Sequence, residues 1–507
     1  MLLPMSPTDS VFLSVESPQT PMHVGGLELF EPAADSGSAS EIFEQLSSGD
    51  DVAPLFKKRA RRSLASAGQW AWEEDRQFDL RHHVRHNSLP QPGRVLELLA
   101  LCSRLHGTLL DRQRPLWELH FIEGLADGRF ALYLKVHHAL LDGLSAQRLL
   151  QRILTKDPAT RDLPPPWANR PAPVRPAAPA RPDGPAQPDG PAQQDGPARQ
   201  DEPARQDEPA RQDGPARQDE PARQDGPAQP SPEEVVANLL RATRAVAADV
   251  AGIPAALART VNRGLQAQGA PISFAAPRSM LNVPISGSRR FAAQSWPLER
   301  IHRIRRGAGC TVNDVVLATC SGALRTYLSS FDALPESPLI AMVPVALRVR
   351  DRHRESGNAL GAVMCDLGTH LAEPADRLDT VRRSMKEGKQ ALSELTPLQI
   401  VAMTGLGMSP LMLQSIPGYA ELLRPPFNLI ISNVPGPRAP LYLNGARLAG
   451  IYPLSIPYHG QALNITCTSY ADELSFGLTG CRRTVPHLQR MLGYLEDELT
   501  ALEQAVG

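Results

Sequence analysis

Hydrophobic and polar positions alternate along residues 128–136, "GRFALYLKV", and the alternation runs directly into a pair of adjacent histidines. The apolar positions on one side of this pattern are Phe130, Leu132, Leu134 and Val136. A period of two predicts a β-strand. Residues 143–154, "GLSAQRLLQRIL", have helical spacing instead. The pair His137-His138 is therefore expected between a strand and a helix, where open α/β sheets present their chemistry.

The second half of the chain continues with strand-like and helix-like segments. Residues 338–350 predict a buried strand, and residues 428–437 predict a strand that ends in a turn. Helical periods occupy residues 376–392 and 231–250, and the latter segment begins with a capping box. This order of elements predicts a two-domain α/β or α+β architecture with mixed sheets.

A compositional boundary separates the two halves. Between residues 164 and 230 a proline recurs every six residues, in units such as "PARQDE" and "PARQDG". Such units contain too little apolar surface to offset the entropy of an ordered chain, so we expect a long disordered linker that acts as a tether. The predicted domains are residues 1–163, the linker 164–230, and residues 231–507.

Composition narrows the class of protein. The 507 residues carry 53 Lys+Arg and 54 Asp+Glu, a formal net charge of −1, which gives no sign of nucleic-acid binding. The six cysteines are far apart, so reduced thiols in the cytoplasm are expected, with no metal site. The N-terminus lacks the features of a secretion signal. The apolar stretch 395–420 is interrupted by prolines and glycines and does not predict a membrane-spanning helix.

The segment H-H-x-x-x-D-G at residues 137–143 suggests proton transfer. Histidine titrates near neutral pH and can remove a proton from a hydroxyl as that hydroxyl attacks a thioester. Adjacent residues of a strand point to opposite faces, so only one of the two rings can face a given cavity. Asp142 could orient a ring or pair with an arginine, and Gly143 would permit a tight turn. The alternative is a core histidine beside an exposed one, without catalysis.

Further blocks resemble the bacterial wax ester synthase/diacylglycerol acyltransferase family, within the coenzyme-A-dependent acyltransferases that carry H-H-x-x-x-D-G. The similarity covers both halves of the chain in family order. Its blocks are "SPTDSVFL" (6–13), "PMHVGGLELF" (21–30), residues 109–146, "LNVPISGSRRFA" (281–292), "TVNDVVLA" (311–318), "MVPVALR" (342–348) and "SNVPGP" (432–437).

The resemblance implies two similar α/β domains of the chloramphenicol-acetyltransferase type, with mixed sheets and a tunnel at their interface. It implies an O-acyltransferase that moves a long-chain acyl group from acyl-CoA, a co-substrate, to a fatty alcohol or diacylglycerol, with no other cofactor. By this resemblance His138 is the base, His137 supports its geometry, Asp142 is structural and Gly143 forms the turn at the substrate site.

Three other matched residues have a binding and a structural interpretation. Trp117, in the P-L-W block, is either a packing anchor near the tunnel or a participant in the chemistry. Asn313 either contacts the acyl oxygen or acceptor, or belongs to a helix cap with Asp314. Asn433 lies in a Pro-Gly turn that could be purely structural.

Two other functions remain open from the sequence. One is a condensation-type acyltransferase that takes its acyl group from a carrier protein, and the other is a lipid-binding protein without turnover. The lipid substrates imply peripheral attachment to the inner membrane or to lipid inclusions, with residues 395–420 or the helix from Pro232 as contacts. Residues 355–370, rich in small side chains, are a plausible tunnel wall.

Overall fold

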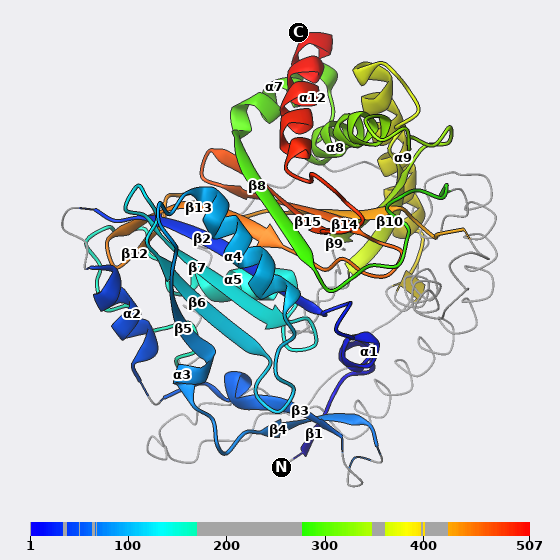
Figure 1. Ribbon diagram of the computed structural model, residues 1–507. Coiled ribbons are helices and arrows are strands. Elements are labelled where there is room, and N and C mark those ends of the chain that lie inside the picture. Colours follow the sequence, from blue (N-terminus) through cyan, green and yellow to red (C-terminus); the bar gives the residue numbers. More distant parts are fainter. Residues whose placement is uncertain are drawn as a thin grey trace, which may run out of the picture. The chain divides into compact units, whose positions relative to one another are not determined.

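The computed structural model describes residues 2–33, 38–49, 51–62, 66, 68–169, 276–346, 360–396, 399–400 and 424–506 (Figure 1). Several predictions fall outside these ranges. They are the linker beyond residue 169, the helix over 231–250, and most of the apolar stretch 395–420. No helix within the described ranges is both long enough and apolar enough to cross a membrane.

The first sheet has six strands in the order β12-β13-β2-β7-β6-β5. Its strands are β2 (His23–Glu31), β5 (Val84–Ser88), β6 (Trp117–Glu123), β7 (Phe130–His137), β12 (Tyr442–Leu443) and β13 (Ala446–Leu454). All neighbours are antiparallel except β5 and β6, so the sheet is mixed. Strand β13, orange in Figure 1, pairs with the blue β2, which brings the C-terminal part of the chain into the first sheet.

The second sheet also has six strands, in the order β10-β9-β11-β14-β15-β8. They are β8 (Arg289–Pro297), β9 (Ile340–Ala346), β10 (Leu360–Asp366), β11 (Leu429–Val434), β14 (Leu463–Tyr470) and β15 (Glu473–Cys481). Strand β11 runs parallel to both of its neighbours, and the other pairs are antiparallel. A small antiparallel sheet contains β1 (Leu2–Pro4), β4 (Trp70–Glu74) and β3 (Lys58–Arg62). The predicted mixed α/β fold is thus confirmed.

Helices cover these sheets. They are α1 (Pro7–Val15), α2 (Ala39–Ser47), α3 (Leu80–His83), α4 (Val95–Gly107), α5 (Gly143–Gln151), α7 (Leu298–Ala308), α8 (Val312–Ser329), α9 (Pro374–Ser393) and α12 (Arg490–Val506), with a short 3-10 helix η1 (Pro54–Lys57). The helix predicted over 376–392 is confirmed as part of α9, because its apolar positions recur at helical spacing and face the second sheet.

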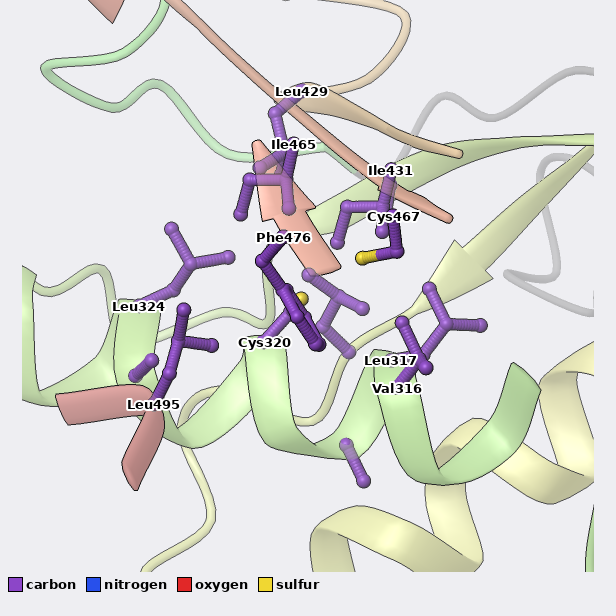
Figure 2. Packing of buried hydrophobic residues seen from close by; sticks show 14 of the residues in the cluster. Val316, Leu317, Cys320, Leu324, Leu429, Ile431, Ile465, Cys467, Phe476 and Leu495 are labelled. Carbon is purple, nitrogen blue, oxygen red and sulfur yellow. The ribbon is translucent and has the colours of Figure 1, made fainter. Parts of the chain in front are cut away.

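Helix α8 forms the centre of the larger hydrophobic core. It begins at a capping box between Thr311 and Asp314, and most of its residues are buried. Figure 2 shows Val316, Leu317, Cys320 and Leu324 of α8 among side chains of β11, β14, β15 and α12. A helix buried on most sides has only a narrow polar stripe, and the polar residues of α8 that are not fully buried include Asn313, Arg325 and Thr326.

Candidate active site

Strand β7 separates the environments of the two histidines. It pairs with β2 so that Val136 lies opposite Val24 and His137 lies opposite His23. Side chains alternate between the two faces, so Val136 and His137 point in opposite directions. The backbone N–H of His138 donates to the Met22 carbonyl at 2.9 Å, which extends the pairing by one residue. Position 138 therefore continues the row of Val136.

The ring of His137 is fixed inside the protein. Its Nδ1 accepts a hydrogen bond from the Ala139 backbone N–H at 3.1 Å, which leaves Nε2 as the ring nitrogen that can carry a proton. That Nε2 lies 3.4 Å from Oε1 of the buried Glu16. Glu16 also accepts from the backbone N–H of Met22 at 3.0 Å and from the Arg112 guanidinium at 2.9 Å. These contacts hold the turn that follows β7.

The pKa of Glu16 agrees with a fixed contact between its carboxylate and the His137 ring. Burial raises the pKa of Glu16, but its bonds to His137, Met22 and Arg112 outweigh burial and lower that pKa below its ordinary value. Glu16 is therefore a charged acceptor at neutral pH. The sequence motif did not reveal Glu16 or Arg112.

His138 is half-buried and stacks on Phe12 of α1, with ring centroids 4.3 Å apart and an interplanar angle of 19°. Burial lowers the pKa of His138, and the nearby charge of Asp142 offsets part of that effect. The ring is therefore largely neutral at pH 7. A neutral imidazole is the form that can accept a proton from a hydroxyl.

Asp142 and Gly143 begin helix α5. The Asp142 carboxylate accepts a hydrogen bond from the Ser145 backbone N–H at 2.7 Å and so caps the helix. Gly143 is the first helical residue, its φ is outside the left-handed region, and a Cβ built there would meet no atom of the described residues within 4 Å. Neither packing nor the φ angle therefore requires a glycine here, and the structure gives no support for the predicted tight turn at Gly143.

An apolar cavity adjoins this motif. Its walls come from β2, β7 and α5, from β13, and from β11 and β14 of the second sheet. Val136 and Gly143 lie at the end near the histidines, and Glu28 also lines the cavity. The cavity is small in this structure, with a volume of about 70 Å³, enough for a few water molecules. Gln147 Nε2 donates to Thr468 Oγ1 at 3.1 Å and thereby joins α5 to β14 across it.

Among the predicted site residues, Gly143 belongs to the described cavity lining, whereas the two histidines, Asp142, Trp117 and the two asparagines do not. Trp117 is buried in the core of the first sheet, where its indole N–H donates to the Phe56 carbonyl at 2.9 Å and its ring stacks on His83 and Trp167. These contacts are those of a packing anchor.

The two asparagines occupy different elements. Asn313 lies in the first turn of α8, where Thr311 and Asp314 form the capping box and Asn313 is not part of it. Asn433 belongs to β11, one residue before Val434, which does line the cavity. Asn433 is thus the sequence neighbour of a cavity-lining residue, whereas Asn313 is not.

Two family models match this chain. One is described as the wax ester synthase/diacylglycerol acyltransferase catalytic domain and matches residues 5–195 and 199–316. The other is described as the WS/DGAT C-terminal domain and matches residues 356–503. The chain belongs to the wax ester synthase/diacylglycerol acyltransferase family. The resemblance seen in the sequence blocks is confirmed, and with it the expectation of an acyltransferase.

Members of this family are similar to the chain over its full length. A probable diacylglycerol O-acyltransferase of Mycobacterium tuberculosis is 45% identical over 505 residues, 99% of each protein. The solved structure of a wax ester synthase/diacylglycerol acyltransferase from Marinobacter aquaeolei VT8 is 38% identical, with a TM-score of 0.69 and coverage of 99% of this chain and 100% of that one.

The fold is shared more widely than the family. The first condensation domain of the CDA synthetase has a TM-score of 0.55 at 14% identity, covering 100% of this chain and 97% of that domain. At this identity the likeness concerns the fold alone.

Proposed function

We propose that this protein transfers a long-chain acyl group from acyl-CoA to the hydroxyl of a fatty alcohol or of diacylglycerol, with His138 as the general base. The observation that carries the proposal is the position of His138. It is a neutral imidazole at the end of β7, in the row of Val136, which lines an apolar cavity. Family membership supplies the reaction class.

In the proposed reaction a ring nitrogen of His138 takes the proton of the acceptor hydroxyl as its oxygen bonds to the thioester carbon. The carbonyl oxygen becomes an oxyanion, which backbone N–H groups or the side chain of Asn433 stabilise. The carbon–sulfur bond then breaks, and the thiolate of coenzyme A leaves with the proton from the imidazolium. No acyl-enzyme intermediate is required, because holding both substrates together suffices.

Other residues of the motif position this base. His137, fixed between Ala139 and Glu16, sets the path of the chain beside His138. Asp142 caps α5 and fixes the start of the helix that lines the cavity. Both are positioning residues in this account.

The function is tested by following thiol release with a thiol-reactive dye. Purified protein is mixed with hexadecanoyl-CoA alone, then with hexadecanol or a diacylglycerol added. We expect thiol release that depends on the acceptor and an ester product in equal amount. Tight binding of acyl chains without thiol release would instead indicate a lipid-binding protein, and activity only with an acyl carrier protein would indicate a condensation-type enzyme.

We also propose peripheral attachment to a bilayer or lipid-inclusion surface, because both acceptors are dissolved in membranes. Flotation of the protein with vesicles of anionic phospholipid that contain diacylglycerol is the measurement. Protein that stays in the bottom fraction at every lipid concentration would refute the attachment.

A further inference from the structure

Glu28 is an acidic residue in the interior of the first sheet. It lies on β2, opposite Leu132 of β7 on one side and Ile451 of β13 on the other. Its side chain is 0% exposed, and neither carboxyl oxygen has a hydrogen-bond partner among the residues that the structure describes. Glu31, at the exposed end of the same strand, pairs with Arg447 at 3.1 Å instead. A buried polar group without a partner is costly and calls for an explanation.

The carboxyl of Glu28 is uncharged at neutral pH. Burial raises its pKa to about 8. A protonated carboxyl has one O–H donor as well as a carbonyl acceptor. Glu28 can therefore donate a hydrogen bond to a neutral oxygen, which a carboxylate cannot do.

Glu28 lines the apolar cavity next to the histidine motif. The other hydrogen-bonding side chains of that lining already have partners among the described residues. Gln147 is bonded to Thr468, and Thr466 donates to Asn464 at 2.9 Å. Within the described lining, Glu28 is thus the polar side chain that makes no hydrogen bond at all.

The register gives the distance from Glu28 to the reaction centre. Glu28 is paired with Leu132, six residues before His138 on the neighbouring strand. An extended strand advances about 3.3 Å per residue, so the two backbone positions are about 20 Å apart. This is the scale of an extended long acyl chain, and too far for Glu28 to contact the reacting ester.

We propose that the cavity receives the far end of a substrate chain and that Glu28 donates a hydrogen bond to an oxygen carried there, a hydroxyl or a keto group. The inference rests on the proposed function. It assigns to the enzyme a class of substrates oxygenated near the end of the chain. The chain can belong to the acyl donor or to the alcohol, and the experiment has one arm for each.

The first arm compares 16-hydroxyhexadecanoyl-CoA with hexadecanoyl-CoA, both with hexadecanol. The second compares 1,16-hexadecanediol with hexadecanol, both with hexadecanoyl-CoA. We expect the parent protein to favour the hydroxylated chain in one arm by about tenfold in kcat/KM, the effect of one well-placed hydrogen bond. Glu28→Leu should abolish this preference, whereas Glu28→Gln should keep part of it because the amide also donates.

Glu31→Gln is the matched control, since it changes a glutamate of the same strand outside the cavity, and it should leave the preference unchanged. Glu28→Leu should also raise the melting temperature, because an apolar side chain replaces an unpartnered carboxyl. A lower melting temperature would show that the carboxyl is structural and would overturn the inference. Equal preference in the parent and Glu28→Leu proteins, in both arms, would overturn it as well.

Failure of the two proposals can be told apart. If the parent esterifies plain chains without preferring hydroxylated ones, only the role of Glu28 is refuted. If no donor releases thiol, the proposed function fails, and calorimetric binding of 16-hydroxyhexadecanoic acid and hexadecanoic acid still tests Glu28. Tighter binding of the hydroxy acid, lost in Glu28→Leu, would support its role, and equal binding would refute it.

Discussion

At the scale of single residues, Glu28 has a measurable effect on stability besides its proposed role in binding. Its carboxyl keeps a proton in the folded protein up to about pH 8, whereas in the unfolded chain the ordinary value is 4.5. The folded state therefore binds one more proton than the unfolded state between these two values. The proton on Glu28 therefore makes its full contribution to the free energy of unfolding below pH 4.5, and this contribution is lost as the pH rises toward 8.

This difference predicts a pH-dependent effect of Glu28→Leu. Between pH 5 and pH 8 the free energy of unfolding of the parent should fall, relative to that of the variant, by up to about 1.4 kcal/mol per pH unit. Urea unfolding of both proteins at each pH measures it, and other titrating groups cancel in the comparison. A constant difference between the two proteins across this range would show that Glu28 is not protonated in the fold.

The adjacent histidines show what a motif can and cannot reveal. Alternation along the strand predicts that His137 and His138 face different surroundings, and the cap made by Asp142 follows from a residue type that prefers helix starts. The partner of His137 could not be predicted, because Glu16 lies more than a hundred residues away in sequence. Glu28 did leave a signal, since it is an acidic residue between Leu27 and Leu29 in the middle of β2.

At the scale of elements, α9 and α12 are joined by a buried ion pair. Arg377 donates to both oxygens of Glu498 at 2.7 Å, and the two side chains are 3% and 8% exposed. Gly322 of α8 packs directly against the Glu498 carboxyl and leaves no room for a Cβ. Three helices over the second sheet therefore meet at this pair.

We predict that Glu498→Gln destabilises the protein by about 3 kcal/mol, because the Arg377 charge then stays buried without a counter-charge. Urea unfolding at pH 7 measures the loss. The matched control is Glu299→Gln, which breaks the exposed pair with Arg306 and should cost less than about 1 kcal/mol. Equal effects of the two substitutions would contradict this account of α9 and α12.

Elements differ in how far the sequence predicts them. Strand β7 and helix α9 follow from their hydrophobic periods, because each has one face on a core and another that differs in polarity. The place of β13 does not follow from its own residues, since nothing in "ARLAGIYPL" shows that it pairs with β2, more than four hundred residues earlier. Pairing between distant strands depends on the whole fold rather than on local pattern.

At the scale of the whole molecule, the proline repeat is predicted from sequence to be a tether. Lengthening or shortening a flexible loop changes its closure cost only slowly, about 0.6 kcal/mol per doubling. Deleting residues 191–226, six repeat units, should therefore leave acceptor-dependent thiol release within about twofold of the parent. A loss of activity beyond tenfold at an unchanged melting temperature would show that the repeat contributes to function.

The shared fold does not choose the substrate. Condensation domains have this architecture at low identity, so the fold alone does not identify the substrates of this protein. The sequence blocks predicted the family and its reaction class because each is a local pattern that can be seen in the sequence itself. They also occur in family order along both halves. The cavity wall itself could not be listed in advance, because it combines strands and a helix from both sheets.

The most direct test of the account is the activity of His138→Ala. We predict that acceptor-dependent thiol release falls by about 10²–10⁴-fold, as is typical for loss of a general base, with an unchanged melting temperature. The control is His86→Gln, an exposed histidine 3.2 Å from Glu123, which should keep the parent rate. Esterification of hexadecanol by His138→Ala at the parent rate would contradict the central claim that this imidazole accepts the proton.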